Sequence, residues 1–291
     1  MSCSKRTIFT LASARSGTLY LKSLFQKNTR NCACRHEPFF DWGNPTFFGP
    51  AIYDAYAGRL DRLRKRMAKK HDYVQHLPGD TYLESSHAVL KSAYRVALEF
   101  FPDLRLIHLI RDPLRVARSE AWRETWRRRF QAPFHFYKGE DGRRHFAWAL
   151  TGNEEIFRTL SGRRLSLFEW YLVQWIEIEN RAMRFLDENH LHDRCFALQT
   201  AELNDPSKVR EMFDFLALPP ARDEVFLEGR KNRSFGYSSV VTDEETNQWS
   251  AILHQLPSHY LEIFHREPYV SCEWWGRRFE KEKPLINAAL L

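Results

Sequence analysis

The sequence predicts a single α/β domain with a central parallel β-sheet flanked by helices. Two short apolar runs, residues 7–12 and 104–110, have the length of buried strands and are bounded by turn residues. A helical pattern follows each run directly, which is the alternation expected of a parallel sheet. The chain has 291 residues and is 43% hydrophobic, which is enough to bury one large core.

The remaining elements follow from the same two periodicities. Further strands are expected at residues 31–36, 82–84 and 194–199. Helices are expected at residues 18–28, 51–70, 88–101, 113–128, 165–189 and 206–216, and over most of 243–265. No repeat or linker divides the chain, so we expect one domain over residues 1–291. Residues 131–164 are the least periodic part, and we expect a lid or an insertion there.

Charge and cysteine content narrow the class of protein. The formal net charge of +7 favours an anionic partner such as a nucleotide, a nucleic acid, an acidic glycan or a lipid surface. The five cysteines are odd in number and scattered, so reduced thiols fit better than a disulfide framework. No apolar run approaches the ~20 residues of a membrane span. The apolar run at 7–12 is too short for the core of a secretory signal, so we expect a cytoplasmic protein.

A loop of small residues joins the first strand to the first helix. Four of its residues suit an anion: Arg15, Ser16, Gly17 and Thr18. Free amides at a helix start, with the positive end of the helix dipole, attract negative charge. Gly17 lets the backbone approach a ligand closely, and Arg15 brings a fixed charge that matches phosphate geometry. The loop therefore predicts a phosphate site.

The same loop differs from that of a nucleotide triphosphatase. In the pattern G-x-x-x-x-G-K-[ST], aligned on Gly17, Ala12 replaces the first glycine. Thr18 stands at the lysine position, and Leu19 stands where a hydroxyl would bind magnesium. We therefore expect a phosphate-binding loop, including Leu19, that requires no metal. An ordinary N-capped helix is the alternative.

A second candidate anchor follows the strand at 104–110. The first residue beyond it is Arg111, where the corresponding strand of a triphosphatase would end in a carboxylate that holds magnesium. Ser119 lies about two turns into the next helix, close enough to share a ligand with Arg111. Each residue also has a simpler explanation. Arg111 could pair with Asp112, and Ser119 could be a solvated helix position. Taken singly, these explanations are favoured over a ligand site.

Together, the two motifs resemble those of the sulfotransferase family. Residues 15–18 match the family's 5′-phosphosulfate loop, and Arg111 and Ser119 match the arginine and serine that bind the 3′-phosphate. The resemblance implies a P-loop-like sulfotransferase fold and 3′-phosphoadenosine-5′-phosphosulfate (PAPS) as co-substrate. Arg15 stands where cytosolic small-molecule members carry lysine, which favours the bacterial or carbohydrate-type branches.

Two later segments resemble the same family less specifically. Residues 203–206 and 213–219 are similar to the family's late "DP…FLGLP" helix. The family's C-terminal basic loop, which covers the nucleotide, is matched by Arg230, Lys231, Asn232 and Arg233. The resemblance therefore extends from residue 7 to about residue 237.

Three residues are candidates for a general base. Glu37 matches an acid that carbohydrate-type members place in a similar setting, and the aromatic stretch 39–42 is expected to raise its pKa. His36 precedes it, although alternation along a strand would point His36 to the other face. His87 follows the short strand 82–84, at the sheet edge where α/β proteins bind ligands, although a helix cap explains this segment equally well.

The expected function is transfer of a sulfuryl group from PAPS to a hydroxyl or amine of a glycan, lipid or small molecule. Arg15 would stabilise the leaving phosphate, and Glu37 or a histidine would accept the acceptor's proton. Cys32 and Cys34 lack a partner pair at zinc spacing, so no metal is expected. Four tryptophans lie in regions that could line an acceptor cleft: Trp42, Trp122, Trp126 and Trp148.

Two other classes of function stay open. One is a small-molecule or nucleotide kinase with a degenerate P-loop, and the other is a nucleic-acid-binding protein. No nucleic-acid-binding motif with interleaved aromatic residues supports the second, so no nucleic-acid partner is expected. A lipid acceptor would add a peripheral membrane contact. The acceptor's identity and the oligomeric state do not follow from the sequence.

Overall fold

A five-stranded parallel sheet forms the centre of the computed structural model, which describes residues 5–37, 43–130, 133–228 and 240–278. The strand order is β2-β3-β1-β4-β7, and every neighbouring pair is parallel. The strands are β1 (Arg6–Ala12), β2 (Cys32–Arg35), β3 (Thr81–Glu84), β4 (Arg105–Ile110) and β7 (Cys195–Gln199). The predicted α/β class and all five predicted strands are confirmed.

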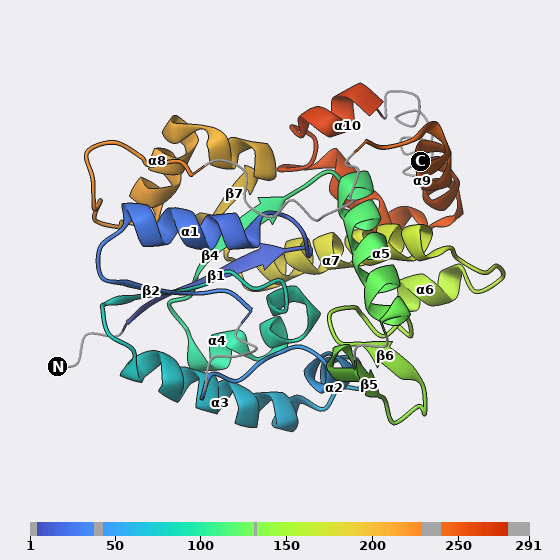
Figure 1. Ribbon diagram of the computed structural model, residues 1–291, viewed down its shortest axis with the longest axis horizontal. Coiled ribbons are helices and arrows are strands. Elements are labelled where there is room, and N and C mark those ends of the chain that lie inside the picture. The colour runs from blue at the N-terminus through green and yellow to red at the C-terminus, as the bar shows by residue number, and fades with distance from the viewer. Residues whose placement is uncertain (1–4, 38–42, 131–132, 229–239, 279–291) are drawn as a thin grey trace.

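Helices cover both faces of the sheet (Figure 1). They are α1 (Thr18–Asn28), α2 (Pro50–Tyr56), α3 (Leu60–His76), α4 (Ala97–Phe100), α5 (Pro113–Arg129), α6 (Glu155–Thr159), α7 (Leu167–Glu188), α8 (Pro206–Phe215), α9 (Asp243–Gln255) and α10 (Glu273–Arg278). Alternation along β1 divides the core: Ile8 packs with the apolar side chains of α1 and α8, whereas Phe9 packs with those of α3 and α7. Within the described ranges, no helix is both long and apolar enough to cross a membrane.

Three predicted helices are interrupted. The helix expected at 51–70 is two helices, α2 and α3, because Gly58 between them adopts a left-handed φ of 70°. The segment 88–101 forms two 3₁₀ turns and the short α4, since the hydroxyl of Ser92 donates to the carbonyl of Phe47 at 2.6 Å and the Ser92 backbone leaves the helical region. Beyond α9, Pro257 ends the helix and two 3₁₀ turns follow.

The aperiodic segment 131–164 contains an antiparallel hairpin and a short helix. Strand β5 (Phe136–Lys138) pairs with β6 (Arg144–Phe146), and α6 follows. Phe146 and Ile156 lie buried in the main core, so the described part of this segment is packed onto the domain. Its role as a lid stays a prediction.

The connections of the sheet create a crevice between two central strands. From β1 the chain crosses to β2 at one edge of the sheet, and from β4 it crosses to β7 at the other edge. In open α/β sheets, ligands bind where successive crossovers diverge in this way, at the carboxyl ends of the strands. The residues that follow β1 and β4 are those of the two predicted anion motifs.

A buried ion pair fixes the end of β3. The Lys70 ammonium donates to the Glu84 carboxylate at 2.6 Å and to the side-chain oxygen of Asn44 at 2.5 Å. The hydroxyl of Tyr82 donates to the same Glu84 oxygen at 2.6 Å. Lys70 and Glu84 are only 1% and 6% exposed, so each charge is balanced inside the protein. Glu84 therefore has a structural role within the 84–87 segment.

We expect Lys70→Met to lower the free energy of unfolding by about 3–5 kcal/mol, because it leaves the Glu84 carboxylate buried without its cation. Urea unfolding monitored by circular dichroism measures the change. The neighbouring exposed Lys69 supplies the control, and Lys69→Met should stay within about 0.5 kcal/mol of wild type. Equal stability of the two variants would contradict this account of β3.

Candidate active site

The loop after β1 makes a tight turn. Arg15 and Gly17 both have left-handed backbone conformations, with φ of 63° and 94°. The hydroxyls of Ser13 and Ser16 lie 2.8 Å apart and hydrogen-bond across the turn. A Cβ atom at residue 17 would lie 3.1 Å from Cγ2 of Thr200, so a side chain there would be crowded as well as strained in its backbone.

The loop directs the start of α1 toward the crevice. Gly17 is the N-cap and provides no side-chain cap, and the first turn of α1 contains no acidic residue. The amides of this turn therefore present an uncompensated positive end of the helix dipole. Thr18 is buried and Leu19 is half-buried at this position. This geometry is that of an anion site.

The two predicted motifs meet in the structure. The Arg15 guanidinium donates through Nε to the hydroxyl of Ser119 at 2.9 Å. The Arg111 guanidinium donates to the backbone carbonyl of Arg15. Ser119 is only 3% exposed, so it is not the solvated helix position that the sequence left open. Asp112 caps α5 by accepting from the amide of Leu114 at 3.0 Å, which aligns the helix that carries Ser119.

Two residues that the sequence reasoning missed hold this arrangement. The hydroxyl of Thr200, directly after β7, is within hydrogen-bonding distance of the Ser16 carbonyl at 2.8 Å and the Ile110 carbonyl at 3.1 Å. The indole of Trp175 on α7 donates to the Arg111 carbonyl at 3.1 Å. Thr200 follows a predicted strand, and this position at the carboxyl edge of the sheet could have identified it as a site residue. Trp175 had no such signal within its helix.

The candidate bases lie together at the ends of β2 and β3. One carboxylate oxygen of Glu37 is 3.0 Å from Nε2 of His87 and 3.9 Å from Nε2 of His36. The expectation that His36 points away is wrong, because β2 ends at Arg35 and strand alternation does not reach His36. Nδ1 of His36 is instead 2.8 Å from the Ser85 carbonyl, and Glu37 turns the chain with φ of 40°.

The charges around Glu37 decide its ionisation. Burial acts to raise its pKa, but the opposing influence of His87, His36 and Arg123 is larger and holds the pKa below the usual range. The expected raised pKa is therefore wrong, because the positive neighbours outweigh burial. The aromatic stretch 39–42 lies outside the described residues. Burial, together with the charge of Lys91, lowers the pKa of His87 to about 3, so the imidazole is neutral at pH 7.

A buried polar network surrounds this pair. Lys91 is fully buried, and its ammonium donates to the backbone carbonyl of Trp148. Burial lowers the pKa of Lys91 to about 7. Arg123 on α5 donates to the Glu120 carboxylate at 2.7 Å, and its guanidinium lies 5.9 Å from the centre of the Trp148 ring. Lys91 and Arg123 were not predicted, since their sequence context is that of ordinary helical positions.

Aromatic rings form one wall beside the candidate base. Phe48 lies edge-on to the His87 ring at 4.8 Å between centres and 6.0 Å from Trp148. The His135 ring lies 4.9 Å from the Trp148 ring between centres. Rings of this kind can line an acceptor site, and that role of Trp148 stays a prediction.

The structure does not test the predicted nucleotide-covering loop. Arg230, Lys231, Asn232 and Arg233 lie outside the described residues. Within the part of the chain that the structure describes, no group of three or more histidine, cysteine or acidic side chains is placed to hold a metal ion. The thiols of Cys32 and Cys34 lie 3.5 Å apart on β2.

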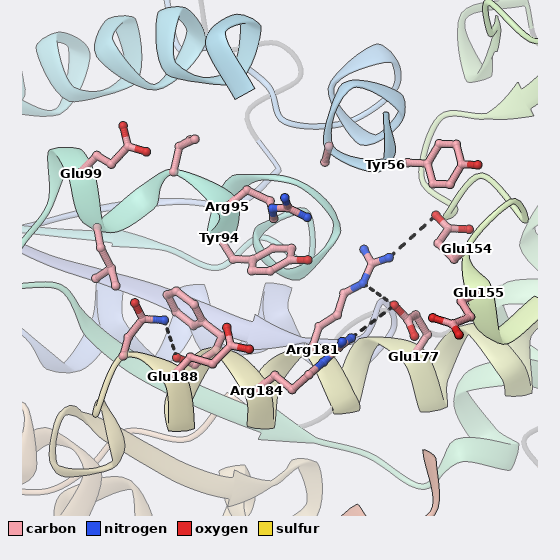
Figure 2. Close-up of a pocket in the computed structure, with 15 residues that line it drawn as sticks. Tyr56, Tyr94, Arg95, Glu99, Glu154, Glu155, Glu177, Arg181, Arg184 and Glu188 are labelled. Atoms are coloured by element: carbon pink, nitrogen blue, oxygen red, sulfur yellow. Dashed lines mark hydrogen bonds and ion pairs between the residues drawn. The ribbon is translucent and has the colours of Figure 1, made fainter. Parts of the chain in front are cut away.

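A separate cavity of about 670 Å³ lies beside α7 (Figure 2). Its charges pair with one another: Arg181 contacts Glu177 at 2.8 Å and Glu154 at 3.9 Å, and Arg184 contacts Glu177 at 3.7 Å. Arg181 also donates to the backbone carbonyl of Lys91 at 3.5 Å. None of the predicted site residues lines this cavity. Its role is structural, because Arg181 connects the cavity to the backbone of Lys91.

The buried Lys91 predicts a specific pH dependence of stability. The unfolded chain keeps this ammonium charged up to its ordinary pKa of 10.5, whereas the folded protein releases the proton above about pH 7. Between these values the unfolded state binds more protons, so stability conferred at this site rises with pH. The difference in unfolding free energy between wild type and Lys91→Met should therefore rise by up to about 1.4 kcal/mol per pH unit from pH 7 to 10.

Urea unfolding of both proteins at several pH values measures this slope. Lys65→Met removes an exposed ammonium from α3 and should give a difference that does not vary with pH. A flat difference for Lys91→Met as well would show that Lys91 stays charged in the folded protein.

Comparisons with known proteins bear on the fold. No protein-family model matches the chain, and no curated protein matches it. Among solved structures, a sulfotransferase from Alicyclobacillus acidocaldarius is similar, with 14% identity and a TM-score of 0.48 over 93% of this chain and 99% of that one. The sulfotransferase domain from the curacin biosynthetic pathway is similar with 15% identity and a TM-score of 0.40, over 97% of this chain and 99% of that one. Likeness at this level leaves the chemistry to be argued from the site itself.

Proposed function

We propose that this protein is a sulfotransferase that transfers a sulfuryl group from PAPS to a hydroxyl or amine. One observation carries the proposal: Arg15 contacts Ser119, and Arg111 contacts the Arg15 carbonyl, at the crevice where the chain diverges from β1 and β4. Two cations and a helix start meet there, which suits a ligand with two separate anionic groups.

The donor's two ends would bind to different parts of this arrangement. The amides at the start of α1, with Arg15, would hold the 5′-phosphosulfate. Arg111 and Ser119 would hold the 3′-phosphate. Ser119 accepts a hydrogen bond from Arg15 and still has its own hydroxyl proton to donate to a phosphate oxygen. The basic segment 230–233 is proposed to cover the nucleotide, as the family resemblance implies.

The reaction would be an in-line displacement at sulfur. The acceptor oxygen or nitrogen forms a bond to sulfur, and the bond from sulfur to the 5′-phosphate oxygen breaks. Negative charge grows on that phosphate oxygen, where Arg15 and the loop amides stabilise it. The products are the sulfated acceptor and 3′-phosphoadenosine-5′-phosphate (PAP). Arg15 and the loop amides fill the charge-stabilising role, so the proposed reaction needs no metal ion.

The acceptor's proton would pass to the Glu37–His87 pair. At pH 7 the carboxylate is ionised and the imidazole is neutral, so both can accept a proton. An anionic donor bound nearby raises the pKa of both groups and makes them stronger bases. The aromatic wall of Phe48 and Trp148 would hold the acceptor against this pair.

A kinase with a degenerate P-loop is not favoured. Thr18 replaces the phosphate-binding lysine, and Arg111 stands where the magnesium-binding carboxylate would be. A thermal-shift panel distinguishes the classes. A sulfotransferase should be stabilised by PAP in excess chelator, a kinase by ATP with magnesium, and a nucleic-acid-binding protein by an oligonucleotide. Stabilisation by magnesium-ATP alone would refute the proposal.

Arg111→Ala should weaken binding of PAP by about 1.5–3 kcal/mol, roughly 10- to 150-fold, and change binding of adenosine-5′-phosphosulfate much less. The reason is that only PAP carries the 3′-phosphate that Arg111 would contact. Isothermal titration calorimetry with both ligands measures the two effects. Arg115→Ala, an exposed arginine on the same helix, is the control and should bind both ligands like wild type. If Arg111→Ala lost the same affinity for both ligands, Arg111 would not be the residue that binds the 3′-phosphate.

Glu37→Gln should lower turnover roughly 10²–10⁴-fold, because it keeps the side chain's shape and removes the charge that accepts or stabilises the transferred proton. Turnover is measured as PAP release with a cell extract as the source of acceptor. The affinity for PAP should stay within about twofold of wild type, and Glu211→Gln on the exposed face of α8 is the control. Normal turnover in Glu37→Gln would move the role to His87 or His36, which His87→Asn and His36→Asn then test.

A further inference from the structure

The end of α5 carries exposed aromatic side chains between arginines. Trp126, Phe130 and Phe134 are 40%, 66% and 81% exposed. Arg127 and Arg129, also exposed, lie between them in the chain. We call these five residues the α5-end patch. Of the eight large hydrophobic side chains that are exposed among the described residues, three lie in this span of nine residues. That concentration indicates a contact surface, because single exposed apolar residues are common and clusters are not.

The aromatic rings form a continuous stripe along the helix. Trp122 lies 5.6 Å from Trp126 between ring centres, and Trp126 stacks on Phe130 at 5.1 Å with 22° between the planes. These three residues are four apart in sequence, so they share one side of a helix with 3.6 residues per turn. Arg127 and Arg129 then flank the stripe on either side. The stripe is apolar at its centre and cationic at both margins.

The neighbouring hairpin extends the cationic margin. Figure 1 shows the end of α5 beside β5 and β6. The Phe136 ring lies 5.3 Å from the guanidinium of Arg128 and 4.5 Å from that of Arg144, so these two elements present their arginines together. An apolar surface bordered by arginines matches the interface of a bilayer, where rings enter the headgroup region and guanidinium groups meet phosphate.

The patch lies next to the candidate acceptor site. Arg123, one turn before Trp126 and Arg127, stacks over Trp148, and Trp148 contacts His135, the neighbour of Phe134 in the chain. The candidate base Glu37 lies close enough to Arg123 for the arginine to lower its pKa. Arg123, on the same helix as the patch, therefore connects the patch with the candidate acceptor site.

We propose that the α5-end patch docks the protein on a bilayer that contains anionic phospholipid. Phenylalanine rings at 66% and 81% exposure have no hydrogen-bonding group for a soluble polyanion such as an acidic glycan, whereas a bilayer accepts both the rings and the arginines. Docking there would favour an acceptor carried on a lipid, and this part of the inference rests on the proposed function.

Vesicle sedimentation tests the docking. Wild type should bind vesicles of phosphatidylcholine with phosphatidylserine and should not bind vesicles of phosphatidylcholine alone. Arg127→Gln with Arg129→Gln should weaken binding to the anionic vesicles at least about tenfold, because each arginine near a charged bilayer contributes to the affinity. Phe130→Ser with Phe134→Ser should weaken it comparably by removing the inserted rings.

A charge-matched control lies on another helix. Lys65→Gln with Lys69→Gln removes the same two charges from exposed positions of α3 and should leave vesicle binding unchanged. Equal losses in the α3 and α5 variants would mean that net charge alone attracts the protein, which overturns the proposal. Binding to a heparin fragment but not to vesicles would also overturn it.

A thermal-shift measurement with PAP on the same protein separates the docking proposal from the sulfotransferase proposal. Vesicle binding without stabilisation by PAP would support the patch and refute the sulfotransferase activity. Stabilisation by PAP without vesicle binding would refute the patch and leave the sulfotransferase proposal in place.

Discussion

The candidate donor site depends on the hydrogen bonds that hold the ends of β1, β4 and β7 in register with one another. Thr200, after β7, contacts the carbonyls of Ser16 and Ile110, and Arg111 donates to the carbonyl of Arg15. Backbone carbonyls that turn inward at a sheet edge must be satisfied, because burying them unpaired is costly. Here the same contacts that satisfy them also hold the two anion motifs at a fixed separation, so the fold and the candidate site share one set of interactions.

The candidate acceptor site depends on a different physical feature, a set of ionisable side chains that are shielded from water. Lys91 and Glu120 are buried, and Arg123 is partly buried, around the Glu37–His87 pair. His36, His87 and Arg123 lower the pKa of Glu37, and burial with Lys91 lowers that of His87, so several elements together set the protonation state of the pair. Arg181, in the cavity beside α7, donates to the backbone carbonyl of Lys91. A change in any one of these groups would be expected to alter the chemistry at Glu37 without contact with a substrate.

The sequence was informative where a local pattern decides the structure. The five strands and the strand–loop–helix at residues 6–28 follow from short-range periodicity and turn chemistry, and the edge positions of Arg15 and Arg111 follow from them. The turns at Val89–Lys91 and the roles of Trp175 and Arg123 depend on contacts between distant segments, which no local pattern records. The predicted direction of the Glu37 pKa shift was wrong for the same reason, because two of the neighbours that lower this pKa, His87 and Arg123, come from the segment after β3 and from α5.

Two candidate catalytic residues occupy backbone conformations that favour glycine. Arg15 and Glu37 have φ of 63° and 40°, and each such conformation costs a non-glycine residue roughly 1–2 kcal/mol. Glycine would relieve this strain at both positions and would remove the guanidinium and the carboxylate. Selection for thermal stability alone should therefore drift toward glycine at residues 15 and 37, and selection for turnover should oppose it. At these two turns, selection for a stable fold and selection for catalysis therefore favour different residues.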